Sequence, residues 1–140
     1  MAAVLLDTNL LVYAYVTNPS DSRVKKAKEV FERCATIRNA FVSVQNLAEF
    51  SSVCLGEVKP QVPIAEILRA LSGIETAFGV VVPSAGTVRT ALLAVERHQL
   101  SFWDAMIWAT AKENGIERVL SEDFSDGRAI EGVRFENPLT

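Results

Sequence analysis

The chain has 140 residues, 49% of them hydrophobic and 22% charged, and its formal net charge is −3. This is the composition of a folded globular protein, and the length predicts a single domain over residues 1–140. The acidic balance argues against capture of nucleic acid by a basic face, and the presence of only one histidine excludes a histidine-rich zinc site.

The sequence contains no recognisable membrane-spanning or signal segment, and it has two cysteines. No apolar run approaches the roughly 20 residues that a membrane-spanning helix needs, and the N-terminus has no signal-peptide pattern. We therefore expect a cytoplasmic chain without membrane contact. Cys34 and Cys54 form no CxxC pair and are expected to be reduced, buried thiols. His98 lies in a charged stretch, which argues against a nucleophile–histidine site.

The first half of the chain alternates short apolar runs with helical patterns. Apolar spacing of three and four predicts helices, and short apolar runs predict buried strands. The expected elements are a strand at Val4–Leu6, a helix over Leu10–Val16 that ends before Asn18-Pro19, a helix that starts at Ser20-Asp21-Ser22 and runs to about Ala35, a strand at Ala40–Val42 and a helix capped by Ser43.

The same alternation continues in the second half. The expected elements are a helix over Ile64–Ile74, a strand at Val80–Val82, a helix over Thr87–Gln99 with Val88, Ala91, Leu92 and Val95 facing inward, a helix over Ser101–Asn114, a strand at Arg118–Leu120 and a closing strand at Val133–Phe135. Strands that alternate with helices predict a central parallel sheet, here of four to five strands, with helices on both faces.

Four acidic residues occupy similar places in this pattern. Asp7 and Asp123 directly follow strands, Glu49 lies in the helix after the second strand, and Asp104 lies in the first turn of the Ser101 helix. Because parallel sheets bind ligands beyond the carboxyl ends of their strands, all four are expected to converge there. Each also has a structural alternative. Asp7 and Asp104 could simply cap helices. Glu49 could lie on a solvated helix face, and Asp123 could belong to a turn.

The joint pattern favours a metal site. Clustered carboxylates repel one another and raise their own pKa values, whereas a divalent cation keeps them ionised. Oxygen ligands without histidine or cysteine suit Mg²⁺ or Mn²⁺. Glu122 and Asp126 lie beside Asp123, and either one remains a candidate to replace or assist it.

The residues around these acids resemble a known family, the PIN domains. The segment Val4–Leu11 is similar to their opening, where an apolar strand is followed by Asp, a hydroxyl residue and Asn. The segments Ser101–Ile107 and Leu120–Phe124 resemble their third and fourth acidic motifs, and Glu49 stands at the place of their mid-chain Glu. The compact length and the run Glu122–Gly127 resemble the VapC-type toxins of toxin–antitoxin pairs. Ser121 departs from the usual Thr but keeps the hydroxyl.

This resemblance implies a three-layer α/β/α PIN-like fold and Mg²⁺-dependent cleavage of RNA by metal-activated water, with Mn²⁺ as a substitute. The fragments would end in a 5′-phosphate and a 3′-hydroxyl. It also implies a protein antitoxin as partner and a homodimer. The metal-site acids would be Asp7, Glu49, Asp104 and Asp123, and the residues that orient them would be Asn9, Ser101, Thr8 and Ser121.

Three other functions remain open from the sequence. A Mg²⁺-dependent phosphohydrolase of small molecules also begins with an Asp after its first strand, but it usually has a second Asp where this chain has Asn9. It also needs a lysine, for which Lys112 is the nearest candidate. A non-catalytic binding module on the same fold would not need Mg²⁺. A DNA nuclease would share the site and differ only in substrate.

Some residues are candidates for RNA contacts outside the metal site. Trp103 adjoins Asp104, whereas Trp108 lies at helical spacing within an apolar segment and is expected in the core. A cationic helix face is a candidate for phosphate contacts, with a solvated surface as its alternative. The basic residues of this face are Arg23, Lys25, Lys26 and Lys28.

Overall fold

A computed structural model describes residues 2–15, 20–124 and 126–140. The expected helix end at Val16, the Asn18-Pro19 break and Ser125 lie outside the described residues. Within these ranges, six strands form one sheet in the order β3-β2-β1-β4-β6-β5. The strands are β1 (Val4–Leu6), β2 (Ala40–Ser43), β3 (Gly79–Val81), β4 (Arg118–Leu120), β5 (Ala129–Ile130) and β6 (Val133–Glu136).

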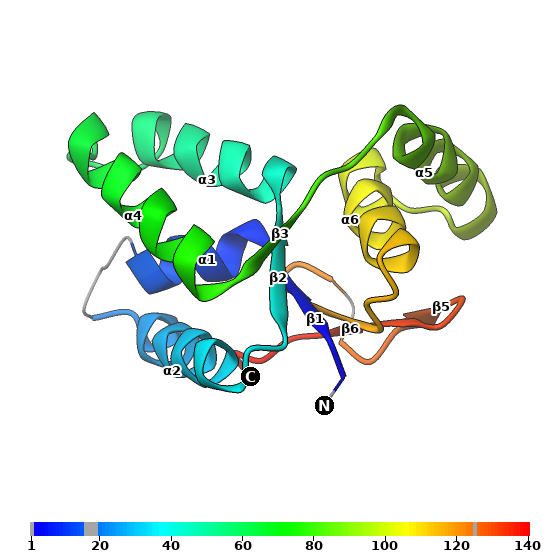
Figure 1. Ribbon diagram of the computed structural model, residues 1–140, viewed down its shortest axis with the longest axis horizontal. Helices are drawn as coiled ribbons and strands as arrows, with labels where there is room; N and C mark the ends of the chain where they lie inside the picture. The colour runs from blue at the N-terminus through cyan, green and yellow to red at the C-terminus, as the bar shows by residue number, and fades with distance from the viewer. Residues whose placement is uncertain (1, 16–19, 125) are drawn as a thin grey trace.

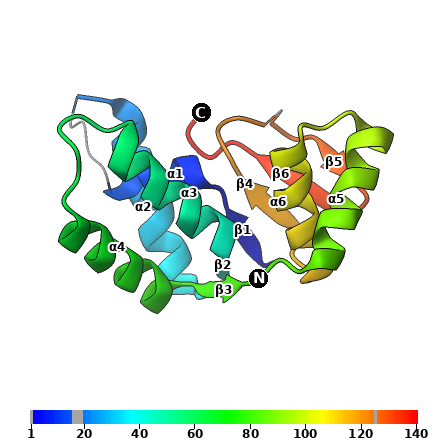
Figure 2. The same cartoon turned by 90° about the horizontal axis from the view of Figure 1, so that it is seen from above.

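Helices cover both faces of this sheet. Figure 1 shows α1 to α4 on one side of the strands and α5 with α6 on the other, and Figure 2 shows the same separation from above. The three-layer α/β/α fold expected from the sequence is therefore confirmed. The helices are α1 (Thr8–Tyr15), α2 (Ser22–Ile37), α3 (Val44–Gly56), α4 (Ile64–Ala77), α5 (Ala85–His98) and α6 (Phe102–Glu113).

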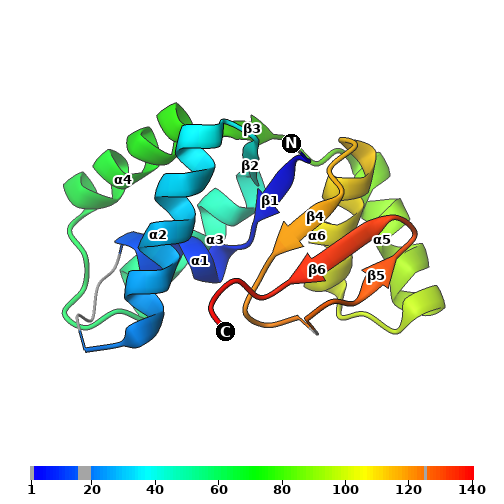
Figure 3. The same cartoon turned by 90° about the horizontal axis from the view of Figure 1, so that it is seen from below.

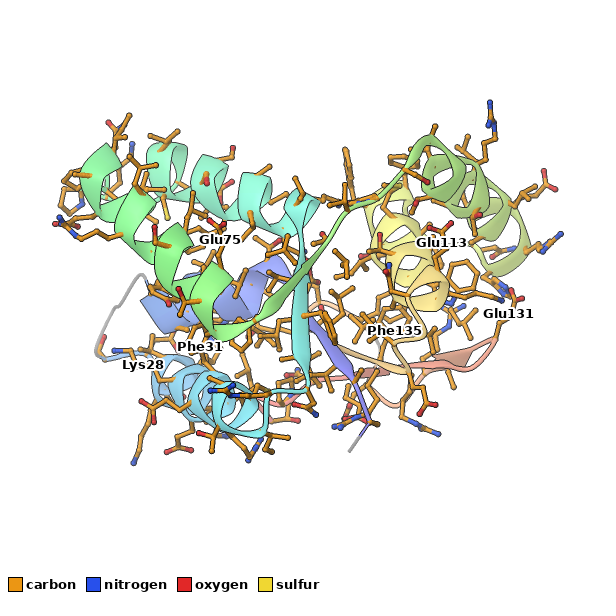
Figure 4. The ribbon with its side chains drawn as sticks, in the orientation of Figure 1. Lys28, Phe31, Glu75, Glu113, Glu131 and Phe135 are labelled. Atoms are coloured by element: carbon orange, nitrogen blue, oxygen red, sulfur yellow. The ribbon has the colours of Figure 1, made fainter. Side chains whose placement is uncertain are left out.

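Each face of the sheet has its own apolar core. Side chains alternate between faces along β1, so Val4 and Leu6 join the core under α1 to α4, while Leu5 joins the core under α5 and α6. Figure 4 labels Phe31 and Phe135, which lie on opposite sides of the sheet in these two cores. Burial on both faces explains why β1 is apolar throughout. It also makes β1 a rigid base for the residue that follows it, Asp7.

The two expected thiols lie in the interior, as the sequence predicts. Cys34 and Cys54 are both buried and both free, and they belong to the core under α1 to α4. None of the helices in the described ranges has the length and apolar character that a membrane crossing requires.

In the described residues the five parallel strands agree with the four to five expected, and the sheet has one additional strand. The additional strand, β5, is only two residues long and pairs antiparallel with β6, as Figure 3 shows from below. Glu131 and Gly132 connect the two strands with φ values of 47° and 88°. A two-residue hairpin loop with both φ values positive matches the twist of antiparallel strands. Because Glu is an unusual residue at the first of these positions, the hairpin could not be recognised from the sequence.

Helix α5 corrects another expectation. Its inward face consists of Thr87, Ala91 and Ala94, whereas Leu92 is 55% exposed and Val88 is 38% exposed. Small residues face α6, because α5 packs closely against that helix. Val88 and Leu92 therefore lie on the outer surface of α5, whereas Val95 packs against the core as expected.

Candidate active site

A pocket of about 410 Å³ lies where β1 and β4 end and where α1, α3 and α6 approach one another. All four acids expected at a metal site line it, although they come from four separate segments of the chain. Thr8 and Asn9 line it as well. Its complete lining is Asp7, Thr8, Asn9, Val12, Tyr13, Gln45, Glu49, Val53, Glu57, Trp103, Asp104, Ile107 and Asp123.

Asp7 is placed by the parallel pairing of β1 with β4. Leu6 is in register with Leu120, and the backbone N–H of Asp7 donates to the carbonyl of Leu120. The carboxylate accepts hydrogen bonds from the backbone N–H of Thr8 at 2.8 Å and from the Ser121 hydroxyl at 2.7 Å. The Ser121 position at the end of the neighbouring strand thus fixes the direction of the Asp7 side chain.

The Asp7 carboxyl has a perturbed pKa. Burial raises its pKa from 3.8 to about 6, and the negative charges of Glu49 and Asp123 act in the same direction. The hydrogen bonds from Ser121 and Thr8 oppose this rise because they favour the ionised form. The effect of Glu49 and Asp123 on Asp7 indicates that these three carboxylates share one electrostatic environment.

Asn9 and Ser121 hold Asp123 beside Asp7. The amide nitrogen of Asn9 donates to Asp123 Oδ2 at 3.1 Å and lies 3.5 Å from Ser121 Oγ. Ser121 Oγ also accepts the backbone N–H of Asp123 at 3.2 Å. Ser121 is only 2% exposed, so its hydroxyl supports Asp7 and Asp123 from beneath the pocket.

Glu122 and Asp126 are directed elsewhere. Glu122 accepts a hydrogen bond from the Tyr13 hydroxyl at 2.9 Å and pairs with Arg23 at 3.3 Å. Burial and the Glu122 hydrogen bond raise the pKa of Tyr13 to about 12, so Tyr13 remains a donor at neutral pH. Asp126 accepts from the backbone N–H of Asn137. Of the three neighbouring acids, only Asp123 lines the pocket.

Glu49 and Asp104 enter the pocket from opposite sides of the sheet. Glu49 lies on α3 and accepts a hydrogen bond from Gln45 Nε2, one turn earlier, at 2.8 Å. Asp104 lies in the first turn of α6, where Ser101 Oγ accepts its backbone N–H at 3.2 Å. Ser101 does not line the pocket. It therefore caps the helix that carries Asp104 instead of reaching the site itself.

The side chains in the pocket suit a hard divalent cation. They offer carboxylate oxygens and, within the described lining, no histidine or cysteine. In the described ranges no three such acids already form a closed cluster that could hold an ion. Mg²⁺ does not require one, because it keeps several of its waters and uses one or two carboxylates. Gln45 Oε1 is buried without a hydrogen-bond partner, and an acceptor of this kind suits a hydrated ion.

A comparison with family models matches residues 4–125 to the PIN domain. The chain belongs to the PIN domain family. The match begins at β1 and ends after Asp123, so it spans all four acids of the pocket. No curated protein matches this PIN domain in a sequence comparison.

Solved structures share the fold of this PIN domain. A toxin–antitoxin complex from Klebsiella pneumoniae has a TM-score of 0.71 at 19% identity, with 97% of this chain and 98% of that chain covered. The sarcin–ricin-loop-cleaving toxin VapC20 of Mycobacterium tuberculosis has a TM-score of 0.67 at 22% identity, with 94% of this chain and 99% of that chain covered. VapBC2 from Rickettsia felis, bound to a promoter DNA fragment, has a TM-score of 0.69 at 18% identity, with 96% of this chain and 98% of that chain covered.

The PIN domain also contains site residues that the sequence reasoning missed. Gln45 was detectable, because it stands one helical turn before Glu49 and can reach it. Asn46 had no such signal. It is buried, pairs with Ser43 in a capping box and donates to the Thr8 hydroxyl at 3.2 Å. This contact joins β2 and α3 to α1 directly behind the pocket.

Several basic candidates do not reach the pocket. Lys112 and His98 both pair with Glu131, at 2.9 Å and 2.7 Å, and neither lines the pocket. The lysine that a phosphohydrolase would need is therefore not supplied by Lys112. Arg23 pairs with Asp21 and Glu122, and Lys26 donates to the carbonyl of Leu139.

Proposed function

We propose that this chain is a Mg²⁺-dependent endoribonuclease, a single PIN domain over residues 1–140 that acts in the cytoplasm as the toxin of a toxin–antitoxin pair. The observation that carries the proposal is one pocket lined by Asp7, Glu49, Asp104 and Asp123. Membership of the PIN family and the fold shared with VapC-type toxins support it.

The chain's own residues prepare the pocket for phosphodiester hydrolysis. Asp7, Glu49, Asp104 and Asp123 would hold Mg²⁺, with Mn²⁺ as a substitute. When bound, the ion supplies positive charge at the scissile phosphate and lowers the pKa of a water molecule. Ser121 and Asn9 keep the Asp7 and Asp123 oxygens aimed into the pocket, and Gln45 does the same for Glu49.

Removal of the metal provides the direct test. A pool of labelled, structured RNAs should be cleaved by the purified chain in Mg²⁺ or Mn²⁺ and should stay intact in EDTA. Because water is the attacking group, we expect fragments with a 5′-phosphate and a 3′-hydroxyl. A cyclic 2′,3′-phosphate would exclude this route, and equal cleavage in EDTA would exclude the metal.

The same assay separates the other candidate functions. Cleavage of single-stranded DNA at the same rate as RNA would make the chain a general nuclease, since water attack does not need the 2′-hydroxyl. Binding of Mg²⁺ without cleavage of any nucleic acid would favour a phosphohydrolase. Absence of both Mg²⁺ binding and cleavage would leave a non-catalytic PIN module.

The charge of the pocket supports a basic antitoxin. Five carboxylates line it, those of Asp7, Glu49, Glu57, Asp104 and Asp123, and the described lining contains no lysine, arginine or histidine. A basic side chain of a partner protein would fit this field and cover the metal-site acids. The antitoxin should therefore stop RNA cleavage when added to the assay. A bound partner that leaves the cleavage rate unchanged would contradict this role.

Exposed apolar side chains support a homodimer. Val82, Leu92 and Leu93 are 72%, 55% and 52% exposed, and they lie on or just before α5. A second copy of the chain would bury this surface. We expect light scattering to give about twice the 15.3 kDa chain mass for the wild type and one chain mass for Leu92→Asp. Leu68→Asp on α4 serves as the control. A dimeric Leu92→Asp protein would rule out this interface.

A further inference from the structure

Trp103 is an exposed aromatic residue at the acidic pocket. Its side chain is 61% exposed and lines the pocket together with Asp104, the next residue of α6. The second tryptophan, Trp108, has a different environment. It is 2% exposed, and its indole N–H donates to the carbonyl of Ile130 at 3.0 Å. Trp108 is therefore a core residue, whereas nothing in the fold requires a large aromatic side chain at position 103.

The Trp103 indole is held in place without being covered. Phe102 contacts it edge-to-face with ring centroids 5.0 Å apart and an interplanar angle of 70°. Phe102 itself packs against the core under α5 and α6. This contact restrains the indole before any ligand binds, which lowers the conformational entropy lost on binding. A restrained and exposed ring next to an acidic pocket is suited to receive another flat group.

The electrostatics of the pocket favour an uncharged contact. Its described lining carries five carboxylates and no basic side chain, so it repels phosphates wherever a cation does not screen the charge. Two of the basic candidates for phosphate contacts, Arg23 and Lys26, are already engaged: Arg23 pairs with Asp21 and Glu122, and Lys26 donates to the Leu139 carbonyl. Stacking of a nucleobase on an aromatic ring needs no positive charge on the protein. It is worth roughly 5- to 150-fold in affinity per base.

We propose that Trp103 forms a nucleobase-stacking subsite, on which an unpaired base next to the scissile phosphodiester lies against the indole. The subsite rests on the ribonuclease function proposed above and adds a substrate contact to it. Because every base has a π-face, this contact selects for an unpaired base and not for one particular base. It would hold the RNA strand at the pocket while the acids act on the adjoining phosphodiester.

A double-mutant cycle that combines a Trp103 variant with the removal of single RNA bases tests the contact. In an RNA that the wild type cleaves, each nucleotide around the scissile bond is replaced in turn by an abasic unit. We expect one position to raise KM by roughly 5- to 150-fold, with kcat much less affected. Trp103→Ala should raise KM by a similar factor on the intact RNA. Its KM should not rise further when the RNA carries the abasic unit at that position. Trp103→Phe should restore most of the affinity.

The control is Leu68→Ala, which shortens an apolar side chain of similar exposure, 59%, on α4, and it should keep the wild-type KM. If Trp103→Ala has the wild-type KM, the subsite is overturned while the ribonuclease function stands. The same holds if, at every position, the KM increases caused by Trp103→Ala and by the abasic unit multiply as independent effects would.

Fluorescence tests the subsite without relying on cleavage. Since Trp108 is buried, a change of emission on adding RNA reports on Trp103, and Trp103→Phe gives the background. We expect an RNA oligonucleotide to quench the emission of the Asp7→Asn protein, and the abasic RNA to quench it much less. If Asp7→Asn is quenched in this way but the wild-type chain cleaves no RNA in Mg²⁺ or Mn²⁺, the subsite is supported and the ribonuclease function is refuted. If the RNA neither quenches Asp7→Asn nor is cleaved by the wild type, both proposals are refuted.

Discussion

Replacement of Asp7 by asparagine is expected to lower the rate of RNA cleavage by about 100- to 1,000-fold and to stabilise the metal-free protein at the same time. The loss of activity follows from removal of a negative oxygen ligand from the pocket, since metal assistance is worth several kcal/mol in such reactions. The gain in stability follows from the cost of holding an ionised carboxylate at this buried position.

The direction of the stability change depends on pH. The folded protein retains a proton on Asp7 up to about pH 6, whereas the unfolded chain releases it near pH 3.8. Stability therefore falls as the pH rises through this interval and stays lower above pH 6. Asparagine imitates the protonated form, so Asp7→Asn should be more stable than the wild type by about 1–3 kcal/mol at pH 7. Below pH 3.8 the difference should vanish.

Urea unfolding in EDTA at several pH values measures this difference. Added Mg²⁺ should stabilise the wild type, because it binds the folded state, and should have much less effect on Asp7→Asn. Asp126→Asn is the matched control, since Asp126 does not line the pocket. A wild-type level of cleavage in Asp7→Asn, or a loss of stability at pH 7, would show that Asp7 is a structural cap.

Much of the fold could be predicted because it rests on local patterns. The strand Val4–Leu6 is apolar on every residue, and the structure buries it on both faces. Its carboxyl end fixes Asp7, and the parallel pairing of Leu6 with Leu120 brings Ser121 and Asp123 to the same edge. Sequence order and the rule for parallel sheets were sufficient to place these residues together.

The remaining features depend on contacts between distant segments. Glu122 and Asp123 are adjacent acids, and only the positions of Tyr13 and Arg23 determine that Glu122 is directed away from the pocket. The outward direction of Leu92 depends on how closely α5 approaches α6. Neither arrangement leaves a periodic signal in the sequence, because both are set by tertiary packing.

Removal of the Ser121 hydroxyl should lower the rate of RNA cleavage substantially, although by less than the loss of Asp7. Ser121 Oγ donates to Asp7 at 2.7 Å and accepts from the backbone N–H of Asp123 at 3.2 Å, so one atom orients two of the four acids. Partners that orient ligands in this way are worth about 10- to 100-fold in activity. We expect Ser121→Ala to lose cleavage activity by that factor at pH 7. Ser121→Thr retains the hydroxyl and should remain active.

The pH profile distinguishes how Ser121 acts. Its hydrogen bond lowers the pKa of Asp7 in the metal-free protein, so Ser121→Ala should raise that pKa. At sub-saturating Mg²⁺, where the ion competes with protons for Asp7, the acid side of the activity profile should therefore move to higher pH. The difference from the wild type should then be largest in mild acid and should narrow at alkaline pH, where Asp7 is ionised in both proteins. A loss that is equal at every pH would mean that Ser121 acts through the position of Asp123 and not through the charge of Asp7.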